Sequence, residues 1–360
     1  MENKIKKILL STLISLSIIQ LSSCKKDENK ITISEVTHSL FYAPMYIAKE
    51  KGFFKEEGLD IDIITSPGAD KVMASLLSKD ATIGLMGPEA SIYVYNNGQK
   101  DYAVNFAQLT RTDGSFLLGR DKNEIFTYDN LKGKTIIGGR QGGMPEMVLE
   151  YILKEKGYSI TRNGKDLSKD INIRTDIAFD VMTAAFVNGE ADYVTAFEPN
   201  ATELEMMNKG YILSSLGEEL NTSIPYTCFS ILKSNLETKK EQIRKFVKAI
   251  EKALSYTLNH EANELVPLLK KEFSTSSNEE IEKVLTNYKK IKAWPETTKF
   301  SKESFDKLID IVKLAGELDK SIVVPYDKLV SQEFLFNYWF IPFISYGLFR
   351  ELVSMRLHSK

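Results

Sequence analysis

The feature that most constrains the fold is a stretch of 32 residues, from residue 32 to residue 63. Residues 32–36 predict a short strand, and an aromatic loop follows at residues 38–44. The spacing of apolar side chains then predicts an amphipathic helix that Gly52 ends, and the alternation in residues 59–63 predicts a second strand. Strand, loop, helix and strand form a βαβ unit. Such a unit implies a parallel sheet with a ligand crevice at the carboxyl ends of its strands.

The first 30 residues predict export and attachment to a membrane. Three lysines precede an apolar run at residues 8–21, which is the layout of a secretory signal peptide. The run ends in Leu-Ser-Ser-Cys, which resembles a bacterial lipobox. We therefore expect residues 1–23 to be removed, Cys24 to be lipidated and residues 24–30 to be a polar tether. The alternative is an uncleaved membrane anchor, but the run is shorter than the roughly 20 residues that a spanning helix needs.

Charge and cysteine content exclude several classes of protein. Residues 1–23 hold three basic residues and one acidic residue, so their removal takes the formal charge from −2 to −4. This value excludes a strongly basic nucleic-acid binder. With Cys24 lipidated, Cys228 is the one free thiol, so we expect no intrachain disulfide and a small buried side chain in its apolar run. Three histidines without a Cys–His spacing predict no metal site.

The order of the predicted elements indicates two lobes. Strand and helix signals alternate from residue 31 to about residue 232, and helical segments dominate afterwards. Near Asp121 the composition becomes polar, and a second series of strands and helices begins. Two such series predict two α/β lobes, with parallel-dominated sheets and helices on both faces. The later helices are predicted at residues 238–269, 279–292 and 301–315.

The candidate ligand-binding residues lie in loops at the predicted strand ends and lobe boundaries. These loops are residues 39–44, 87–91, 108–110, 139–146, 197–199 and 225–227. Glycine-rich turns at helix N-termini also offer free backbone N–H groups to an anion or a polar heteroatom. The candidates are Ser39, Phe41, Tyr42, Pro88, Glu89, Gln108, Arg140, Gly142, Gly143, Glu146, Phe197, Glu198 and Tyr226.

Several of these candidates also have a structural explanation. Tyr42 can stack on a ligand or pack in the core, and Arg140 can bind an anion or be a solvated loop residue. Glu89 and Glu146 lie at predicted helix starts, where a carboxylate offsets the helix dipole without any ligand. Glu198 lies at a strand end and lacks that explanation, so it is the best carboxylate candidate for a ligand contact.

The sequence contains no recognisable catalytic or nucleotide-binding motif. Residues 138–143 read Gly-Gly-Arg-Gln-Gly-Gly, which lacks the Gly-Lys-Ser/Thr of a P-loop and is not GxGxxG in register. G-x-S-x-G, H-E-x-x-H and a Cys–His pair are also absent from the sequence. We expect His38 to be a satisfied loop residue rather than a catalyst. The prediction is a binding protein, without a cofactor or a metal, rather than an enzyme.

The order of these features resembles the periplasmic-type solute-binding proteins of the nitrate/sulfonate/taurine group and their thiamine-pyrimidine relatives. The resemblance implies the two-lobed, type II periplasmic-binding-protein fold. It implies that residues 31–119 and 226–330 form lobe one and that residues 120–225 form lobe two. The chain would cross between the lobes at about residues 117–121 and 224–228, and the cleft would close by bending at these crossings.

The same resemblance implies a function. The chain would be a lipid-anchored receptor at the outer face of the cytoplasmic membrane. It would deliver a small-molecule solute to the permease and ATPase subunits of an ABC importer. One thiamine-pyrimidine branch is instead a pyrimidine synthase that uses a cysteine-rich segment with an internal lysine and histidine. The mature chain has one free cysteine and no such cluster, so this alternative is disfavoured.

The residue types in the crevice loops favour an amino-bearing aromatic heterocycle over an oxoanion. A protonatable aminopyrimidine requires carboxylates that accept from its N–H groups and aromatic faces for stacking. The loops supply three glutamates and four aromatic residues. A sulfonate or nitrate requires cations, hydroxyls and helix N-termini, and Arg140 is the one well-placed cation. We expect a thiamine-precursor-type aminopyrimidine or a similar heterocycle, with an oxoanion such as sulfonate, taurine or nitrate as the alternative.

Residues 331–360 do not fit the resemblance. Residues 334–349 hold eight aromatic side chains, no charge and a central proline. The stretch is short for a membrane span. It could be a peripheral membrane contact, an extra packed segment or a non-native terminus from a shifted reading frame, of which we favour the last.

Overall fold

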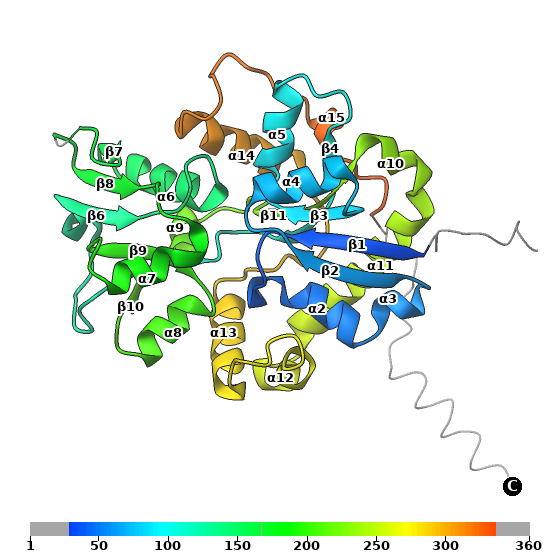
Figure 1. Ribbon diagram of the computed structural model, residues 1–360, viewed down its shortest axis with the longest axis horizontal. Coiled ribbons are helices and arrows are strands. Elements are labelled where there is room, and N and C mark those ends of the chain that lie inside the picture. The colour runs from blue at the N-terminus through cyan, green and yellow to red at the C-terminus, as the bar shows by residue number, and fades with distance from the viewer. Residues whose placement is uncertain (1–28, 167, 336–360) are drawn as a thin grey trace, which may run out of the picture.

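The computed structural model describes residues 29–166 and 168–335, and it arranges them around two sheets (Figure 1). The first sheet contains β1 (Lys30–Glu35), β2 (Asp60–Thr65), β3 (Ile83–Met86), β4 (Ala103–Thr110) and β11 (Thr227–Leu232). The second contains β5 (Ser115–Gly119), β6 (Lys134–Ile137), β7 (Ile160–Arg162), β8 (Ile171–Arg174), β9 (Tyr193–Phe197) and β10 (Tyr211–Ser215). The predicted two-lobed α/β fold is confirmed.

The first sheet has the strand order β2-β1-β3-β11-β4. Ile33 of β1 lies opposite Ile63 of β2 and Ile83 of β3, and both pairings are parallel. α2 (Ala43–Glu50) and α3 (Phe53–Glu56) connect β1 to β2, which confirms the predicted βαβ unit. β3, β4 and β11 are buried along their whole length. Their nearly continuous apolar sequences fit strands that are covered on both faces.

The second sheet has the order β10-β5-β9-β6-β8-β7. β6, β7, β8 and β9 pair in parallel, whereas β5 runs antiparallel to β9 and β10. This lobe lies at the left of Figure 1, and its helices are α6 (Met144–Glu155), α7 (Met182–Val187), α8 (Asn200–Met206) and α9 (Leu216–Leu220). Two short 3-10 helices, η3 (Tyr128–Leu131) and η4 (Phe179–Val181), also belong to it.

The remaining helices belong to the first lobe. They are η2 (Leu40–Tyr42), α4 (Ala69–Ser78), α5 (Glu89–Asn96), α10 (Lys233–Thr238), α11 (Lys240–Asn259), α12 (Ala262–Leu269), α13 (Asn278–Lys290), α14 (Lys302–Leu314) and α15 (Tyr326–Leu329). The single helix predicted at residues 238–269 was wrong. His260 adopts an extended conformation (φ −114°, ψ 147°) that ends α11, and Glu261 forms a capping box that begins α12.

The chain changes sheets between β4 and β5, at residues 111–114, and again between α9 and β11, at residues 221–226. The predicted outward crossing at residues 117–121, and the lobe boundary after residue 119, therefore lie too far along the chain. β5 belongs to the second sheet because Ser115 pairs with Phe197 of β9 and Phe116 pairs with Ser215 of β10. Its apolar sequence shows that it is a buried strand but does not show which sheet it joins.

Both predicted terminal segments lie mainly outside the described residues. The signal peptide and Cys24 fall within residues 1–28, and most of the aromatic tail falls within residues 336–360. Phe334, at the start of that tail, is buried, and its ring lies 6.2 Å from the Phe106 ring of the first lobe. Within residues 29–335, no helix has the length and apolar character to cross a membrane, and no group of His, Cys, Asp and Glu is placed to hold a metal.

Candidate functional site

Four of the predicted aromatic residues meet between the two sheets. Phe41 lies on η2, Phe197 ends β9, and Tyr226 precedes β11. The centroid of the Phe41 ring lies 5.6 Å from that of Phe197, 5.8 Å from that of Tyr226 and 5.7 Å from that of Tyr42. Phe41, Tyr42 and Tyr226 are each less than 5% exposed. We call these four residues the aromatic cluster, and it joins loops from both lobes.

Ser39 connects the first crevice loop to the second lobe. Its hydroxyl donates to the Glu198 carbonyl oxygen at 2.9 Å and accepts from the Phe41 N–H at 3.2 Å. The second bond caps η2, because the Ser39 backbone is extended at the start of that helix. Ser39 therefore fixes the Phe41 ring and holds the two lobes in contact at the same point.

Glu89 lies at the start of α5, directly after Pro88, and is 2% exposed. Its carboxylate folds back over Gly87, where a Cβ atom would lie 2.0 Å from Oε2, so a side chain at position 87 would displace the carboxylate. Oε2 has no hydrogen-bond partner among the described residues. Burial raises the pKa of Glu89 to about 7, with a partial offset from the charge of Arg140. A buried carboxylate with an unused oxygen can accept from a ligand.

Both carboxylate oxygens of Glu198 already have protein partners. Oε2 accepts from the Thr202 N–H at 2.8 Å, and Oε1 accepts from the Thr202 hydroxyl at 3.0 Å and from Asn287 Nδ2 at 2.7 Å. Burial raises the pKa of Glu198, and these bonds oppose the shift. The side chain closes the first turn of α8 and connects it to α13. Its predicted contact with a ligand stays a prediction.

The glycine-rich loop before α6 is held by the protein itself. The Gly142 N–H donates to Glu146 Oε2 at 3.2 Å, and the Gly142 carbonyl accepts from the Tyr93 hydroxyl at 3.1 Å. Gly143 is the N-cap residue of α6. Arg140 is about half exposed and lies 3.8 Å from the Asp70 carboxylate. The loop is therefore connected to the first lobe, and one of its amides is already bonded.

Glu146 belongs to a network of charged side chains around Arg162. Arg162 Nε lies 2.9 Å from Glu146 and 2.5 Å from Glu150, and Nη1 donates to Glu317 at 3.0 Å. Nη2 donates to the Ala315 carbonyl at 2.9 Å. Ala315 and Glu317 follow α14 of the first lobe, so Arg162 connects the lobes. We call this set the Arg162 network. Burial and the adjacent Glu150 raise the pKa of Glu146.

Gln108 has a structural role at the crossings. Its amide nitrogen donates to the Thr110 carbonyl at 3.1 Å and to the Ile224 carbonyl at 3.2 Å. Ile224 N–H in turn donates to the Arg111 carbonyl at 2.9 Å. These bonds fasten the outward and return crossings to each other.

The sequence did not single out Asp113, which is fully buried at the outward crossing. Its Oδ1 accepts from the Ser115 N–H and hydroxyl, both at 2.6 Å, whereas Oδ2 has no partner among the described residues. Burial raises the pKa of Asp113 to about 7, and the nearby Tyr226 hydroxyl opposes the shift. An Asp-Gly pair directly before a strand, in the short connection between β4 and β5, was the available signal.

Tyr288 and Trp294 were also not selected as candidates, because they lie far along the chain. The Tyr288 ring is 5.0 Å from Phe41, and its hydroxyl accepts from the Glu198 N–H at 3.0 Å. Trp294 Nε1 donates to the Phe41 carbonyl at 2.8 Å. The segment after α13 thus folds back behind the aromatic cluster, and the sequence carries no signal for this packing.

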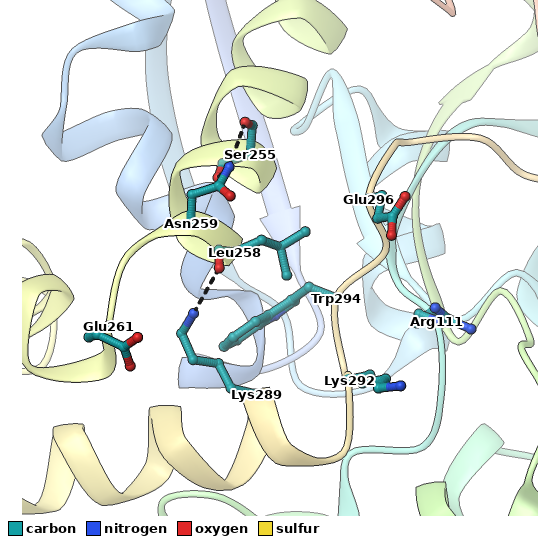
Figure 2. A pocket seen from close by; sticks show the side chains of 9 residues that line it. All are labelled: Arg111, Ser255, Leu258, Asn259, Glu261, Lys289, Lys292, Trp294 and Glu296. Carbon is teal, nitrogen blue, oxygen red and sulfur yellow. Dashed lines mark hydrogen bonds between the residues drawn. The ribbon is translucent and has the colours of Figure 1, made fainter.

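A cavity of about 620 Å³ opens behind Trp294, and Figure 2 shows the indole ring between Lys289 and Arg111. A neighbouring cavity of about 340 Å³ shares Arg111 and Lys292 with it and extends along both crossings. Lys289 Nζ donates to the Thr257 carbonyl at 2.7 Å. None of the thirteen predicted ligand-binding residues lines either cavity. Trp294 separates this groove from the aromatic cluster.

Comparison with known proteins places the chain in a family. A family model described as "NMT1/THI5 like" matches residues 41–264. "Putative binding protein YtlA" of Bacillus subtilis (strain 168) is 43% identical over 315 residues, which cover 87% of this chain and 91% of that protein. The 4-amino-5-hydroxymethyl-2-methylpyrimidine phosphate synthase THI11 of Saccharomyces cerevisiae is 28% identical over 61% of this chain and 64% of that protein.

Among solved structures, the alkanesulfonate-binding protein SsuA from Xanthomonas axonopodis pv. citri, bound to MOPS, matches with a TM-score of 0.66. It is 15% identical and covers 84% of this chain and 98% of that chain, which confirms the periplasmic-binding-protein fold. The predicted resemblance is thereby confirmed. The chain belongs to the NMT1/THI5-like family.

Proposed function

We propose that the protein is an extracytoplasmic receptor that binds a small solute and delivers it to an ABC importer. The solute is an aminopyrimidine of the thiamine-precursor type or a similar amino-bearing heterocycle. The 43% identity to YtlA, a protein whose name describes binding, supports a receptor rather than an enzyme. The partners are a permease and an ATPase, and the anchor is a lipid on Cys24 at the outer face of the cytoplasmic membrane.

The observation that carries the proposal is the environment of the aromatic cluster. Aromatic rings from both lobes meet there, and the buried carboxylate of Glu89 has an oxygen without a partner among the described residues. A flat heterocycle stacks on such rings, and its amino group donates to such an oxygen. Ligand sites of this kind combine apolar walls with a few polar groups that fix orientation.

An oxoanion is the alternative solute. The Xanthomonas neighbour is named for alkanesulfonate binding, but at 15% identity it supports the fold alone. The loop residues argue against an anion here, because Glu146 already accepts from the Gly142 N–H and Arg140 lies beside Asp70. Two buried carboxyl groups, Glu89 and Asp113, would also repel a sulfonate once they are ionised, above about pH 7.

A pyrimidine synthase is the second alternative, since the yeast relatives carry that name. Cys228, the free cysteine of the described residues, is fully buried in β11, and burial raises its pKa well above the ordinary value. A thiol in that setting is a poor participant in chemistry. Turnover of a candidate ligand by the purified protein would overturn the receptor proposal.

Calorimetry tests the proposal directly. The purified protein is titrated with 4-amino-5-hydroxymethyl-2-methylpyrimidine, an alkanesulfonate and nitrate. We expect binding of the pyrimidine, and a loss of about 10-fold to 100-fold in affinity in Glu89→Gln, because a charged or protonatable acceptor is replaced. Glu303→Gln is the matched control, since Glu303 also lies in the first turn of a helix but is exposed. Sulfonate binding that persists in both variants, without pyrimidine binding, would contradict the proposal.

A further inference from the structure

Unpartnered buried oxygen atoms gather at the outward crossing. Seven buried side-chain oxygens in the described part of the chain have no hydrogen-bond partner. Four of them belong to Glu89, Thr110, Asp113 and Tyr226. The Tyr226 N–H donates to the Thr110 carbonyl at 3.2 Å. Burial raises the pKa of Tyr226, and the charges of Asp113, Tyr42 and Glu89 add to the shift, so the Asp113 and Tyr226 side chains interact directly.

Such a concentration is uncommon in a folded protein, because buried polar groups almost always find partners. Each orphaned oxygen costs stability, and polar networks are stable only when every member is satisfied. All four atoms are hydroxyl or carboxylate oxygens, and one of them belongs to Tyr226, whose ring is part of the aromatic cluster. A ligand on the cluster would supply the missing partners.

The local sequence holds Asp113 in a fixed orientation. Ser115 donates twice to Oδ1, at 2.6 Å each, and leaves Oδ2 free. Gly114 follows, and a Cβ atom there would lie 2.5 Å from the Phe41 ring. The glycine therefore lets Phe41 approach the crossing. The carboxylate and the aromatic ring are positioned by adjacent residues, as in a preformed site.

We propose that Asp113 is a ligand-binding residue that acts with Glu89 to select a ligand with several N–H or O–H donors and without an anionic substituent. The inference rests on the proposed function and narrows its solute class. An amino group supplies two donors, a protonated ring nitrogen supplies a third, and a hydroxymethyl group supplies a fourth. Two buried acceptors and the Thr110 and Tyr226 hydroxyls match such a set.

A phosphate ester of the same heterocycle would be rejected. It carries a charge of about −1.5 to −2. Above about pH 7, where Glu89 and Asp113 become ionised, it would face two buried carboxylates. The cation whose charge reaches Glu89 is Arg140, which is about half exposed and already lies 3.8 Å from Asp70. Like charges in a desolvated site cost enough to suppress the wrong ligand strongly.

Calorimetry with two ligands tests the inference. The wild-type protein is titrated with 4-amino-5-hydroxymethyl-2-methylpyrimidine and with its phosphate ester. We expect the unphosphorylated ligand to bind at least about 100-fold more tightly. In Asp113→Asn we expect its affinity to fall by about 10-fold to 100-fold and the preference over the ester to shrink. A thermal melt of each variant confirms that it is folded.

Asp319→Asn is the matched control. Asp319 Oδ1 accepts from the Ser321 N–H at 2.8 Å and from its hydroxyl at 2.5 Å, which repeats the Asp113–Ser115 arrangement on the surface. This variant should behave as the wild type. Equal binding of the two ligands by the wild type, or unchanged binding by Asp113→Asn, would overturn the inference and leave the receptor function standing. Binding of neither ligand would overturn the proposed solute class and this inference together.

Discussion

Replacement of Arg162 by methionine is expected to destabilise the protein by about 3 kcal/mol. Breaking a buried ion pair by removing one partner costs roughly 3–5 kcal/mol. Arg162 contacts the fully buried Glu146 and Glu150, and it also donates to Glu317 and to the Ala315 carbonyl. The lower end of the range applies, because Lys154 still lies 2.7 Å from Glu150 in the variant.

The protonation of Glu146 and Glu150 further limits the loss of stability in this variant. Burial and the hydrogen bond with Glu150 raise the pKa of Glu146, whereas bonds from Glu146, Arg162 and Lys154 lower the pKa of Glu150. Glu146 is therefore protonated more readily than Glu150, so Arg162 balances less than two full negative charges. Its removal should cost less at pH 5 than at pH 8, because low pH neutralises the carboxylate that is left behind.

Urea unfolding followed by circular dichroism measures the effect. A thermal melt measures the same loss as a fall in melting temperature, of about 6–12 °C on the scale of roughly 2–4 °C per kcal/mol that holds for 150–250 residues. Arg174→Met is the control: Arg174 lies 2.7 Å from Asp176 and 3.5 Å from Glu190, but both partners are exposed. Exposed pairs contribute at most about 1 kcal/mol. If the two variants lose the same stability, the Arg162 network does not hold the lobes as we describe.

Three further predictions concern the aromatic cluster and its supports. Gly114→Ala should lose about 1–3 kcal/mol of stability, measured by urea unfolding, because the new Cβ would lie 2.5 Å from the Phe41 ring. Trp294→Phe should lose about 1–3 kcal/mol in the same assay, because the Phe41 carbonyl loses its 2.8 Å donor. For Asp113 the folded pKa of about 7 lies above the ordinary value, so its contribution to stability is lost as pH rises through 7. Between about pH 4 and 7, the unfolding free energy of the wild type should therefore fall relative to that of Asp113→Asn, by at most about 1.4 kcal/mol per pH unit. Parallel profiles of unfolding free energy against pH for the two proteins would refute this.

The local pattern was sufficient to predict the fold. The period of the apolar residues and the glycine at position 52 predicted the βαβ unit, since these depend on neighbours along the chain. The sheet to which β5 belongs could not be predicted, because any buried strand has the same apolar pattern. The break at His260 was missed because the apolar periodicity continues through it and the capping box of Glu261 and Glu264, which begins α12, was not recognised.

The candidate site was predictable in part. Loops at strand ends were found because parallel topology brings such loops together, and the structure gathers Phe41, Tyr42, Phe197 and Tyr226 in one cluster. The free oxygen of a carboxylate cannot be read from sequence. Glu198 was ranked first for lacking a helix-start role, yet its oxygens are bonded to Thr202 and Asn287, whereas Asp113 has a free oxygen. Which carboxylate can accept a hydrogen bond from a ligand depends on the partners that the fold places around it.

A crystal structure of the protein with 4-amino-5-hydroxymethyl-2-methylpyrimidine would show whether the aromatic cluster binds the solute. We expect the ring to lie against Phe41 and Tyr226, with donor groups within hydrogen-bond distance of Glu89 and Asp113. We also expect both lobes to contact the ligand. A pyrimidine bound in the groove behind Trp294, beside Arg111 and Lys292, or bound to one lobe without contact to either carboxylate, would contradict the account.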